Sequence, residues 1–358
     1  MSLHKLDIYR VRNIQQATLY PSTGINFIYG NNGSGKSALL EAIFILGRSR
    51  SFRTHNIKHV INYNASDLVV SGQCLRNNGH ITQIGVQLSY NDSEIRINQA
   101  SHCKRSELAY TFPVQFVYPK SYQLLDGGSS MRREFMDWGI FNQDEDYLLV
   151  WQKYKKCLLH RNALLKDKNL AQLPIWDNEL VHYAKLVSNY RMLYIEQLQE
   201  NFINTCRLFF DIDSVALSYF PGWDFKQEFH DILVANLSKD CRYGITHYGA
   251  HRSDFYLLIN NRIAKDYASR GQLKILVLAL KLAQIQLLSE KFSKMGCFFI
   301  DDFGAELDSV NKFKLLQFLA DSKIQVFLSA NEISQFGDFT CINEAKWFQV
   351  EQGCIKQV

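Results

Sequence analysis

Residues 30–37 read GNNGSGKS, a complete G-x-x-x-x-G-K-[ST] pattern. The run INFIY at 25–29 is apolar and of strand length, and residues 38–46 have a helical pattern that ends at Gly47. A strand, this loop and a helix in that order predict a phosphate-binding loop, because glycines let successive backbone N–H groups point at phosphate oxygens. The alternative is a glycine-rich turn that merely precedes a helix, and the full pattern with these flanks argues against it.

The eight loop residues are the expected nucleotide-binding residues: Gly30, Asn31, Asn32, Gly33, Ser34, Gly35, Lys36 and Ser37. We expect Lys36 to reach the β- and γ-phosphates of a nucleotide and the Ser37 hydroxyl to ligate Mg²⁺.

Length and composition indicate a globular protein with room for about two domains, since the chain has 358 residues and 47% of them are hydrophobic. No apolar run approaches the roughly 18 uninterrupted residues of a membrane span, and the first residues lack the apolar core of a signal peptide. Eight cysteines lie far apart without a C-x-x-C pair, which predicts reduced thiols. We therefore expect a cytoplasmic protein without a membrane partner.

Positive charge is concentrated in two segments, although the net charge is only +5. Residues 42–66 contain no acidic residue and include Arg48, Arg50, Arg53 and Lys58. The second segment, interrupted only by Asp167, contains Lys153, Lys155, Lys156, Arg161, Lys166 and Lys168. Either segment alone is more often a solvated face, but two of them beside a nucleotide site favour a polyanionic partner such as DNA.

The pattern of apolar residues changes along the chain. Short strand-like runs at 6–11, 67–75, 83–90 and 94–97 predict an antiparallel sheet. From about 131 to 210 apolar residues recur at helical spacing, and about 80 residues are too few for two strands of a long coiled coil, so we expect a compact helical lobe. Runs at 297–302, 309–322 and 325–329 read strand, helix, strand and predict a parallel sheet.

These patterns predict an α/β fold with three consecutive segments. Residues 1–125 form the N-terminal half of a nucleotide-binding lobe, residues 126–210 the helical lobe, and residues 211–358 the C-terminal half of the nucleotide-binding lobe.

Two carboxylates follow the predicted strand at 297–300. A phosphate-binding loop needs an acidic residue at the end of a neighbouring strand, because Mg²⁺ prefers oxygen ligands. Asp301 is the expected Mg²⁺ ligand together with Ser37, and Asp302 is placed to orient or deprotonate the attacking water. The expected catalytic residues are thus Lys36, Asp301 and Asp302. Taken alone, the two acids could simply close a strand.

Lys36 and Asp301 are 265 residues apart, so a large insertion separates the two halves of the site. Before the acidic strand, Ser269-Arg270-Gly271-Gln272 opens an apolar helix that runs to about Leu288. Ser269 with Gln272 is also an ordinary capping box, and alone that explanation suffices.

Together these segments resemble the Walker A, signature, Walker B and D-loop motifs of ABC-type ATPase heads. They are residues 30–37, Ser269-Arg270-Gly271-Gln272, Ile300-Asp301-Asp302 and Glu306-Leu307-Asp308, in the order found in SMC-like DNA repair ATPases. More narrowly, the chain is similar to the RecF family of bacterial recombination mediators. That similarity is carried by Arg12-Asn13, Gly127-Gly128, residues 132–139, residues 251–254 and residues 269–274.

The resemblance implies an ABC-type head with a parallel P-loop sheet, an antiparallel β subdomain and a helical lobe without long coiled-coil arms. It implies ATP and Mg²⁺ as cofactors, with ATP held between two copies of the chain. In such heads the signature segment faces the nucleotide of the second copy, so Ser269, Arg270, Gly271 and Gln272 would bind ATP in trans.

The resemblance also implies a function and partners. It implies a slow, DNA-stimulated ATPase that dimerises on ATP and acts at gaps or single-strand/double-strand junctions in recombinational repair and replication restart, helping to load recombinase. Expected partners are double-stranded and gapped DNA, a second copy of the chain, RecR and RecO.

Three positions depart from the ABC pattern or stay open. Asp302 stands where transporters usually have Glu, and Ser329 follows the next strand where many ABC proteins place a switch histidine. The Q-loop glutamine is Gln115 or Gln123.

Two other functions share parts of the pattern. A transporter motor subunit has the same motifs, but a Gly-Gly signature and no basic helical lobe. A small-molecule P-loop kinase does not account for Ser269 or the D-loop segment.

Overall fold

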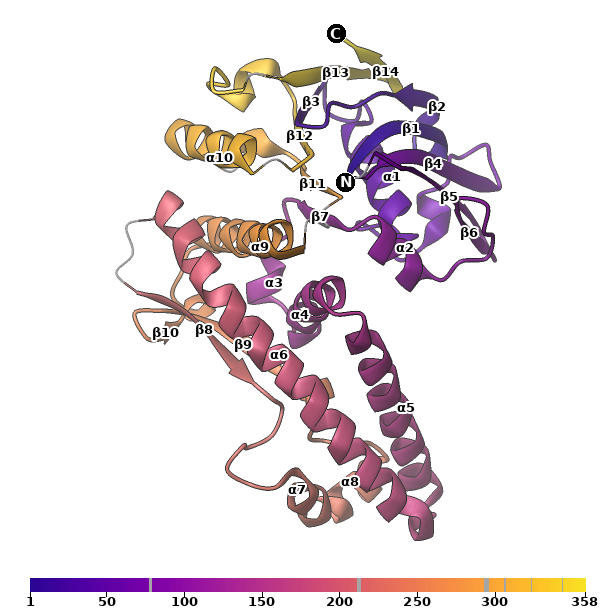
Figure 1. Ribbon diagram of the computed structural model, residues 1–358, viewed down its shortest axis with the longest axis vertical. Helices are drawn as coiled ribbons and strands as arrows, with labels where there is room; N and C mark the ends of the chain where they lie inside the picture. Colours follow the sequence, from indigo (N-terminus) through magenta and orange to yellow (C-terminus); the bar gives the residue numbers. More distant parts are fainter. Residues whose placement is uncertain (77–78, 211–213, 293–295, 306, 323, 343) are drawn as a thin grey trace. The chain divides into compact units, whose positions relative to one another are not determined.

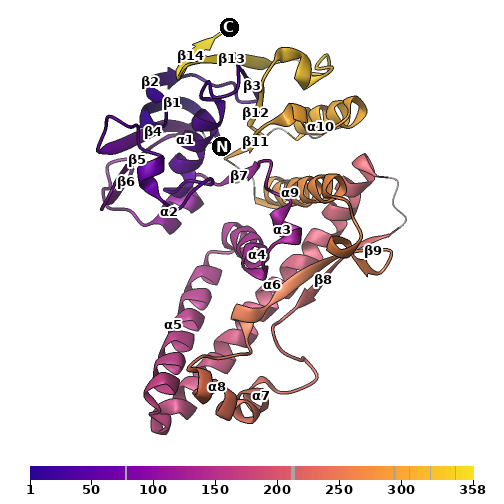
Figure 2. The same cartoon turned by 180° about the vertical axis from the view of Figure 1, so that it is seen from behind.

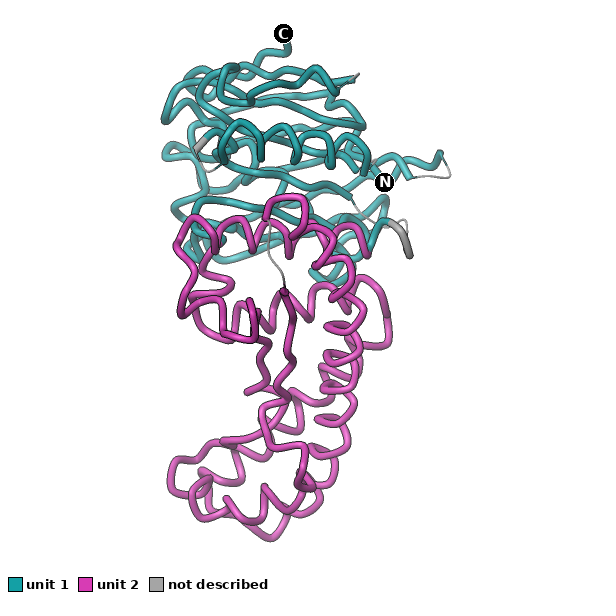
Figure 3. Tube along the Cα trace, turned by 90° about the vertical axis from the view of Figure 1, so that its left-hand side faces the viewer, with its two compact units in different colours: residues 1–121, 288–358 teal, residues 122–287 magenta. Residues whose placement is uncertain are grey.

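The computed structural model spans residues 1–358, and the structure describes all of them except 77–78, 211–213, 293–295, 306, 323 and 343 (Figure 1). The chain divides into two compact units, coloured separately in Figure 3: residues 1–121 with 288–358, and residues 122–287. The expected boundary at 210 differs from this division, because residues 214–287 pack within the second unit and not with the nucleotide-binding lobe.

A six-stranded sheet forms the centre of unit 1. Its order is β14-β13-β3-β12-β11-β7, and only the β13–β14 hairpin is antiparallel. The strands are β3 Ile25–Tyr29, β7 Val114–Val117, β11 Cys297–Ile300, β12 Val326–Ala330, β13 Ala345–Glu351 and β14 Cys354–Gln357. Every residue of β11 and β12 is buried, as expected for parallel strands covered on both faces. The predicted parallel sheet is confirmed.

The predicted antiparallel sheet is also present, in the order β2-β1-β4-β5-β6. Its strands are β1 Ser2–Val11, β2 Ile14–Leu19, β4 Asp67–Leu75, β5 Ile81–Ser89 and β6 Ser93–Ile97. Burial alternates along β4 and β5, so one face of the sheet joins the core. The turn expected at 77–79 lies partly outside the described residues.

Helix α1, Lys36–Arg48, lies between the two sheets and contacts strands of both. The sequence pattern predicted a helix end at Gly47, which is wrong: the helix runs to Arg48 and Ser49 takes the left-handed conformation. Gly47 has a packing role, because a Cβ there would lie 2.4 Å from Cγ2 of Val114. In Figures 1 and 2, helix α10, Ser309–Asp321, lies on the side of the parallel sheet away from α1.

The remaining elements of unit 1 are short. They are α2 Arg105–Thr111 and the 3-10 helices η1 Ile57–His59, η5 Phe303–Ala305 and η6 Ile333–Phe336.

Unit 2 is mainly helical, and Figures 1 and 2 both show α5 lying alongside α6. Its helices are α3 Gln123–Asp126, α4 Ser129–Gln143, α5 Asp146–Asp167, α6 Leu173–Phe209, α7 Phe229–Ala235, α8 Leu237–Tyr243 and most of α9 Arg270–Phe292, with η2 Leu170–Gln172, η3 Ala250–Arg252 and η4 Ala264–Asp266. A sheet of order β10-β9-β8 completes it: β8 Val215–Phe220, β9 Asp254–Ile259 and β10 Arg262–Ile263. The expected helical lobe without long coiled-coil arms is confirmed.

Among the described residues one helix segment, Arg270–Ser289 of α9, is long and apolar enough to cross a membrane. Of its apolar window, 72% is buried inside the protein, as in a core helix.

Buried ion pairs connect the elements of unit 2. Arg132 of α4 makes two hydrogen bonds to Asp254 of β9, at 2.6 and 3.0 Å, and donates to the carbonyl oxygen of Gly127. Arg191 of α6 pairs in the same way with Asp137 of α4, at 2.8 Å for both bonds. The segments 132–139 and 251–254, which carried the family resemblance, therefore hold this unit together.

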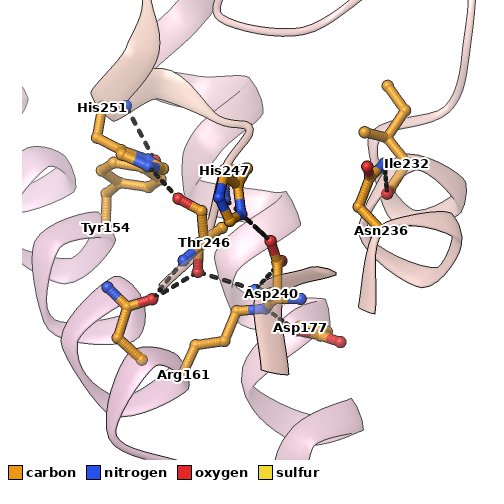
Figure 4. A network of polar contacts seen from close by, with 10 residues as sticks. Tyr154, Arg161, Asp177, Ile232, Asn236, Asp240, Thr246, His247 and His251 are labelled. Carbon is orange, nitrogen blue, oxygen red and sulfur yellow. Dashed lines mark hydrogen bonds and ion pairs between the residues drawn. The ribbon is translucent and has the colours of Figure 1, made fainter. Parts of the chain in front are cut away.

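Arg161 corrects one expectation from the charge pattern. It belongs to the basic segment of α5, but its side chain is fully buried and donates to Asp177, Asp240 and Thr246 at 2.6, 2.6 and 2.8 Å (Figure 4). Breaking a buried pair of this kind by removing one partner costs about 3–5 kcal/mol. Arg161 is thus a structural residue and is inaccessible to DNA.

His251 joins the same network in its neutral form. Its Nε2 lies 2.9 Å from the carbonyl oxygen of Thr246, which can only accept, so Nδ1 accepts from the Tyr154 hydroxyl at 2.8 Å (Figure 4). Burial lowers the pKa of His251 to about 4, aided by Arg252 and Arg133 and opposed by Thr246 and Asp240.

This lowered pKa predicts a loss of stability in acid. Between pH 6.5 and about 4 the unfolded chain binds a proton that folded His251 resists, so this group removes up to about 3 kcal/mol from the free energy of unfolding. In urea denaturation, the stability difference between the wild type and His251→Gln should shrink as pH falls through this range. A difference that stays constant from pH 7 to pH 4 would contradict the lowered pKa.

Candidate nucleotide-binding site

The loop at 30–37 connects the carboxyl end of β3 to the first turn of α1. Gly30 and Gly35 have φ of 153° and 122°, which favour glycine. A Cβ on Gly30 would also lie 2.1 Å from the carbonyl oxygen of Val350, so no larger residue fits. The Ser34 hydroxyl is buried and has no hydrogen-bond partner among the described residues. Asn31, Asn32 and Gly33 are exposed, so the loop offers backbone N–H groups to a ligand.

The Lys36 ammonium group lies inside the curve of its own loop. Its Nζ donates to the carbonyl oxygens of Gly30 and Asn31, at 2.6 and 3.0 Å, and to Oδ1 of Asn331 at 3.0 Å. Burial lowers the pKa of Lys36, and the carboxylates of Asp301 and Asp302 oppose that shift. The charge is therefore positioned where phosphates would enter.

Asp301 follows β11 directly and reaches the start of α1. Its Oδ1 accepts from the Ser37 hydroxyl at 3.2 Å and from the Ser329 hydroxyl at 2.7 Å. Two oxygens from Ser37 and Asp301 are a donor set that suits Mg²⁺, which commonly takes one or two protein oxygens and completes its shell with phosphates and water. The structure thus brings together the two residues that the sequence paired as metal ligands.

Asp302 has φ of 62°, a left-handed conformation that Asp tolerates better than most residues. Its backbone N–H donates to the Ser329 hydroxyl at 3.0 Å, so Ser329 contacts both acids of the pair. Ser329 stands at the switch-histidine position, and its observed contacts are to the acidic residues.

Sequence reasoning missed the contribution of two asparagines. Asn13, after β1, donates to the carbonyl oxygens of Gly33 and Ser34, at 3.3 and 2.9 Å. Asn331, after β12, accepts from Lys36, and its carbonyl oxygen accepts from the Gly30 N–H at 3.2 Å. The available signal was that each polar residue lies just past the end of a strand.

Arg12, the residue before Asn13, holds helix α1, which follows the loop. Arg12 makes two hydrogen bonds to Glu41 of α1, at 2.8 and 3.0 Å, and Glu41 is fully buried. The Ser51 hydroxyl donates to the same carboxylate. Arg12 and Asn13 together therefore hold α1 and the loop against β1.

The two glutamines considered for the Q-loop lie in different units, and Gln115 belongs to unit 1. It lies two residues before the carboxyl end of β7, is buried, and its Oε1 accepts from the Phe116 N–H at 3.0 Å. Gln123 is at the first position of α3, in unit 2. Both glutamines stay candidates for the Q-loop position.

The signature segment lies in unit 2, in a different compact unit from the loop at 30–37. Ser269 and Gln272 form the capping box of α9: the Ser269 N–H donates to Oε1 of Gln272 at 2.9 Å, and the Gln272 N–H donates to Oγ of Ser269 at 3.2 Å. All four residues are exposed: Ser269, Arg270, Gly271 and Gln272. In the D-loop segment Glu306 lies outside the described residues, and Asp308 caps α10 by accepting from the Asn311 N–H.

The basic segments are only partly accessible. Arg48 turns inward and donates to the carbonyl oxygen of Val114, whereas Arg50, Arg53 and Lys58 are exposed. In α5 and just after it, the exposed cations are Lys153, Lys155, Lys156, Lys166 and Lys168.

Comparison with known proteins supports the same architecture over the whole chain. The model of the RecF/RecN/SMC N terminal domain family matches residues 2–355. The chain is 38% identical to the DNA replication and repair protein RecF of Shewanella halifaxensis over 357 residues, covering 99% of this chain and 98% of that protein. It is 37% identical to the RecF protein of Vibrio campbellii over 358 residues, covering 99% and 100%.

Solved structures of related proteins have the same fold over the whole chain. A structure titled as the recombination mediator protein RecF-ATP in the RecFOR pathway superposes with a TM-score of 0.88 at 25% identity, covering 99% of this chain and 97% of that one. The Smc head domain of Pyrococcus furiosus has a TM-score of 0.57 at 16% identity, with 100% and 96% covered, which reflects the fold alone.

The fold, the loop and the acidic strand end thus define an ATPase head of the ABC and SMC class. Within that class, the chain belongs to the RecF family. The resemblance and the fold class expected from the motifs are confirmed.

Lys36→Ala should abolish tight nucleotide binding. Each charge-assisted hydrogen bond contributes about 1.5–3 kcal/mol, so loss of the ammonium group should weaken ATP binding at least tenfold in a titration with a fluorescent ATP analogue. Lys346→Ala is the matched control, since this unit 1 lysine lies outside the loop and donates to the carbonyl oxygen of Tyr20. ATP affinity of Lys36→Ala within twofold of the wild type would refute the role.

Proposed function

We propose that this protein is an ATP-dependent DNA-binding ATPase of recombinational repair and replication restart. It acts at gaps or single-strand/double-strand junctions and helps to load recombinase. The observation that carries the proposal is the contact of Ser37 with Asp301 beside Lys36, in a chain that is similar to RecF proteins over its full length. Those relatives are DNA replication and repair proteins, and one related solved structure is of RecF-ATP, which supports DNA and ATP as ligands.

Lys36 and the loop N–H groups would bind the β- and γ-phosphates, and Ser37 and Asp301 would hold Mg²⁺. When bound, Mg²⁺ neutralises charge that develops on the phosphates. Asp302 would orient or deprotonate the attacking water. Its side chain is shorter than the glutamate of transporter motors, which supports a slow turnover, and we propose that DNA stimulates it.

ATP would be bound between two copies of the chain. Ser269 uses its oxygen as a hydrogen-bond acceptor for capping, so its hydroxyl hydrogen is available to a phosphate oxygen of the partner's nucleotide. The exposed N-terminus of α9, with Arg270, Gly271 and Gln272, would favour that negative charge. Hydrolysis would remove the γ-phosphate contact and loosen the dimer, which makes the cycle a switch.

Double-stranded and gapped DNA would contact the exposed cations of both basic segments through phosphates, without base readout. The related RecF-ATP structure is of a protein of the RecFOR pathway, and on that basis we propose RecR and RecO as partners in the cytoplasm.

Sedimentation with a gapped duplex tests this function. The wild type should co-sediment with the DNA when ATP is present, and Lys36→Ala should not. Binding should weaken with salt at a log-log slope of about −0.9 per neutralised phosphate, and Lys153→Ala with Lys156→Ala should flatten the slope by about 2. Lys226→Ala, at an exposed lysine outside both segments, is the control and should leave the slope unchanged. Absence of DNA binding with ATP, or binding that ignores salt, would reject the proposal.

A second prediction concerns the trans role of Ser269. Asp302→Asn should bind ATP, hydrolyse it slowly and accumulate a dimer in light scattering. Adding Ser269→Arg to this parent should keep ATP binding and leave the protein monomeric, because the larger side chain fills the partner's site. Ser238→Arg, in the first turn of α8 in the same unit, is the matched control. Normal dimerisation of the Ser269→Arg variant would exclude the role.

A further inference from the structure

Tyr63 is 97% exposed, more than any other large hydrophobic side chain in the described part of the chain. Single exposed hydrophobic residues are common on protein surfaces, so exposure alone indicates nothing. The surroundings of Tyr63 supply the argument: a rigid turn, and a positively charged segment without acidic residues.

The turn that carries Tyr63 is fixed to β1. The Ala65 N–H donates to the carbonyl oxygen of Asn62 at 3.0 Å, which closes a β-turn with Tyr63 at its second position. The Asn62 side chain donates to the carbonyl oxygen of Arg12 at 2.6 Å, and the Asn62 N–H donates to the carbonyl oxygen of Arg10 at 2.9 Å. The backbone under Tyr63 is therefore held in place before any ligand arrives.

A second aromatic residue supports the other end of the turn. The Tyr90 hydroxyl donates to the carbonyl oxygen of Ala65 at 3.1 Å, and Nζ of Lys58 lies 5.5 Å from the centre of the Tyr90 ring. This cation is thus positioned on the same small surface as the turn.

The charge of the sequence segment that carries Tyr63 favours an anionic ligand. Residues 42–66 contain no Asp or Glu, and Arg50, Arg53 and Lys58 in this segment are exposed. Just beyond this segment, Asp67 is paired with Arg10 at 2.9 Å. A flat aromatic ring in a basic segment, with Lys58 linked to its turn through Tyr90, matches a base attached to phosphates, because bases stack on aromatic side chains while cations bind the DNA backbone.

We propose that Tyr63 stacks on an unpaired base of gapped DNA. The proposal rests on the DNA-binding function proposed above and specifies which part of the DNA this surface contacts. Bases inside a duplex are already stacked on both faces, whereas an unpaired base has a face available. A tyrosine ring also loses little conformational entropy on binding, since it has two side-chain torsions.

The test compares three circular DNAs of equal length, with ATP present and the full-length protein. One is a closed duplex without ends, the second carries a short gap, and the third carries the same gap with abasic sugars in place of the unpaired nucleosides. The abasic circle keeps every phosphate and removes only the bases. Affinities are measured by fluorescence anisotropy with the label on the duplex part.

The wild type should bind the gapped circle about 5- to 150-fold more tightly than the abasic circle, the range expected for stacking of one base. Tyr63→Ala should bind both gapped circles equally and keep its affinity for the closed circle, while Tyr63→Phe and Tyr63→Trp should retain the preference. Tyr20→Ala, at a half-exposed tyrosine elsewhere in unit 1, is the control and should behave as the wild type. Because Tyr63 packs against little, its replacement should not affect folding.

The outcomes separate the two proposals. If the wild type binds none of the circles, the DNA-binding function fails and the stacking proposal fails with it. If the wild type binds DNA but Tyr63→Ala keeps the preference for bases in the gap, stacking is wrong and the function stands. An equal loss by Tyr63→Ala on all three circles, the closed one included, would assign Tyr63 to the DNA backbone and also overturn the stacking proposal.

Discussion

The parallel pairing of β3, β12 and β11 is the constraint on which the nucleotide site depends. In this register Tyr29 lies opposite Ala330, and Leu328 opposite Ile300, so the carboxyl ends of three strands meet at one edge. The loop at 30–37, Asn331 and Asp301 each follow one of these ends. Residues far apart in sequence are thereby brought together: Oγ of Ser37 lies 3.2 Å from Oδ1 of Asp301. Sites at this edge are the general rule for open α/β sheets.

The phosphate-binding loop is supported from outside as well as from within. Asn13 holds its carbonyl oxygens, Asn331 holds Lys36 and Gly30, and Arg12 fixes α1 through Glu41. The same Arg12 carbonyl oxygen accepts from Asn62, at the base of the turn that carries Tyr63. The loop and the surface proposed to contact DNA are therefore attached to one short segment after β1.

Unit 2 depends on a different kind of interaction. Its elements are tied by arginine–carboxylate pairs with little exposure, such as Arg132 with Asp254 and Arg191 with Asp137. Buried pairs of this kind contribute modest net stability, but their geometry specifies which elements meet, and losing one partner is costly. The segments 132–139 and 251–254, recognisable in the sequence, therefore have a structural role in this unit.

The sequence by itself determined the local elements and the chemistry of the loop. A strand, a glycine-rich loop and a helix follow from short-range pattern and backbone freedom, and Asp301 follows from the need of Mg²⁺ for a carboxylate. Only the tertiary structure decided which residues lie together. It buried Arg161 within a basic segment, assigned residues 214–287 to unit 2, and revealed the contacts of Asn13 and Asn331 with the loop. The physical reason is that burial and long-range hydrogen bonds depend on how elements pack, and one residue's type and spacing carry no information about its distant neighbours.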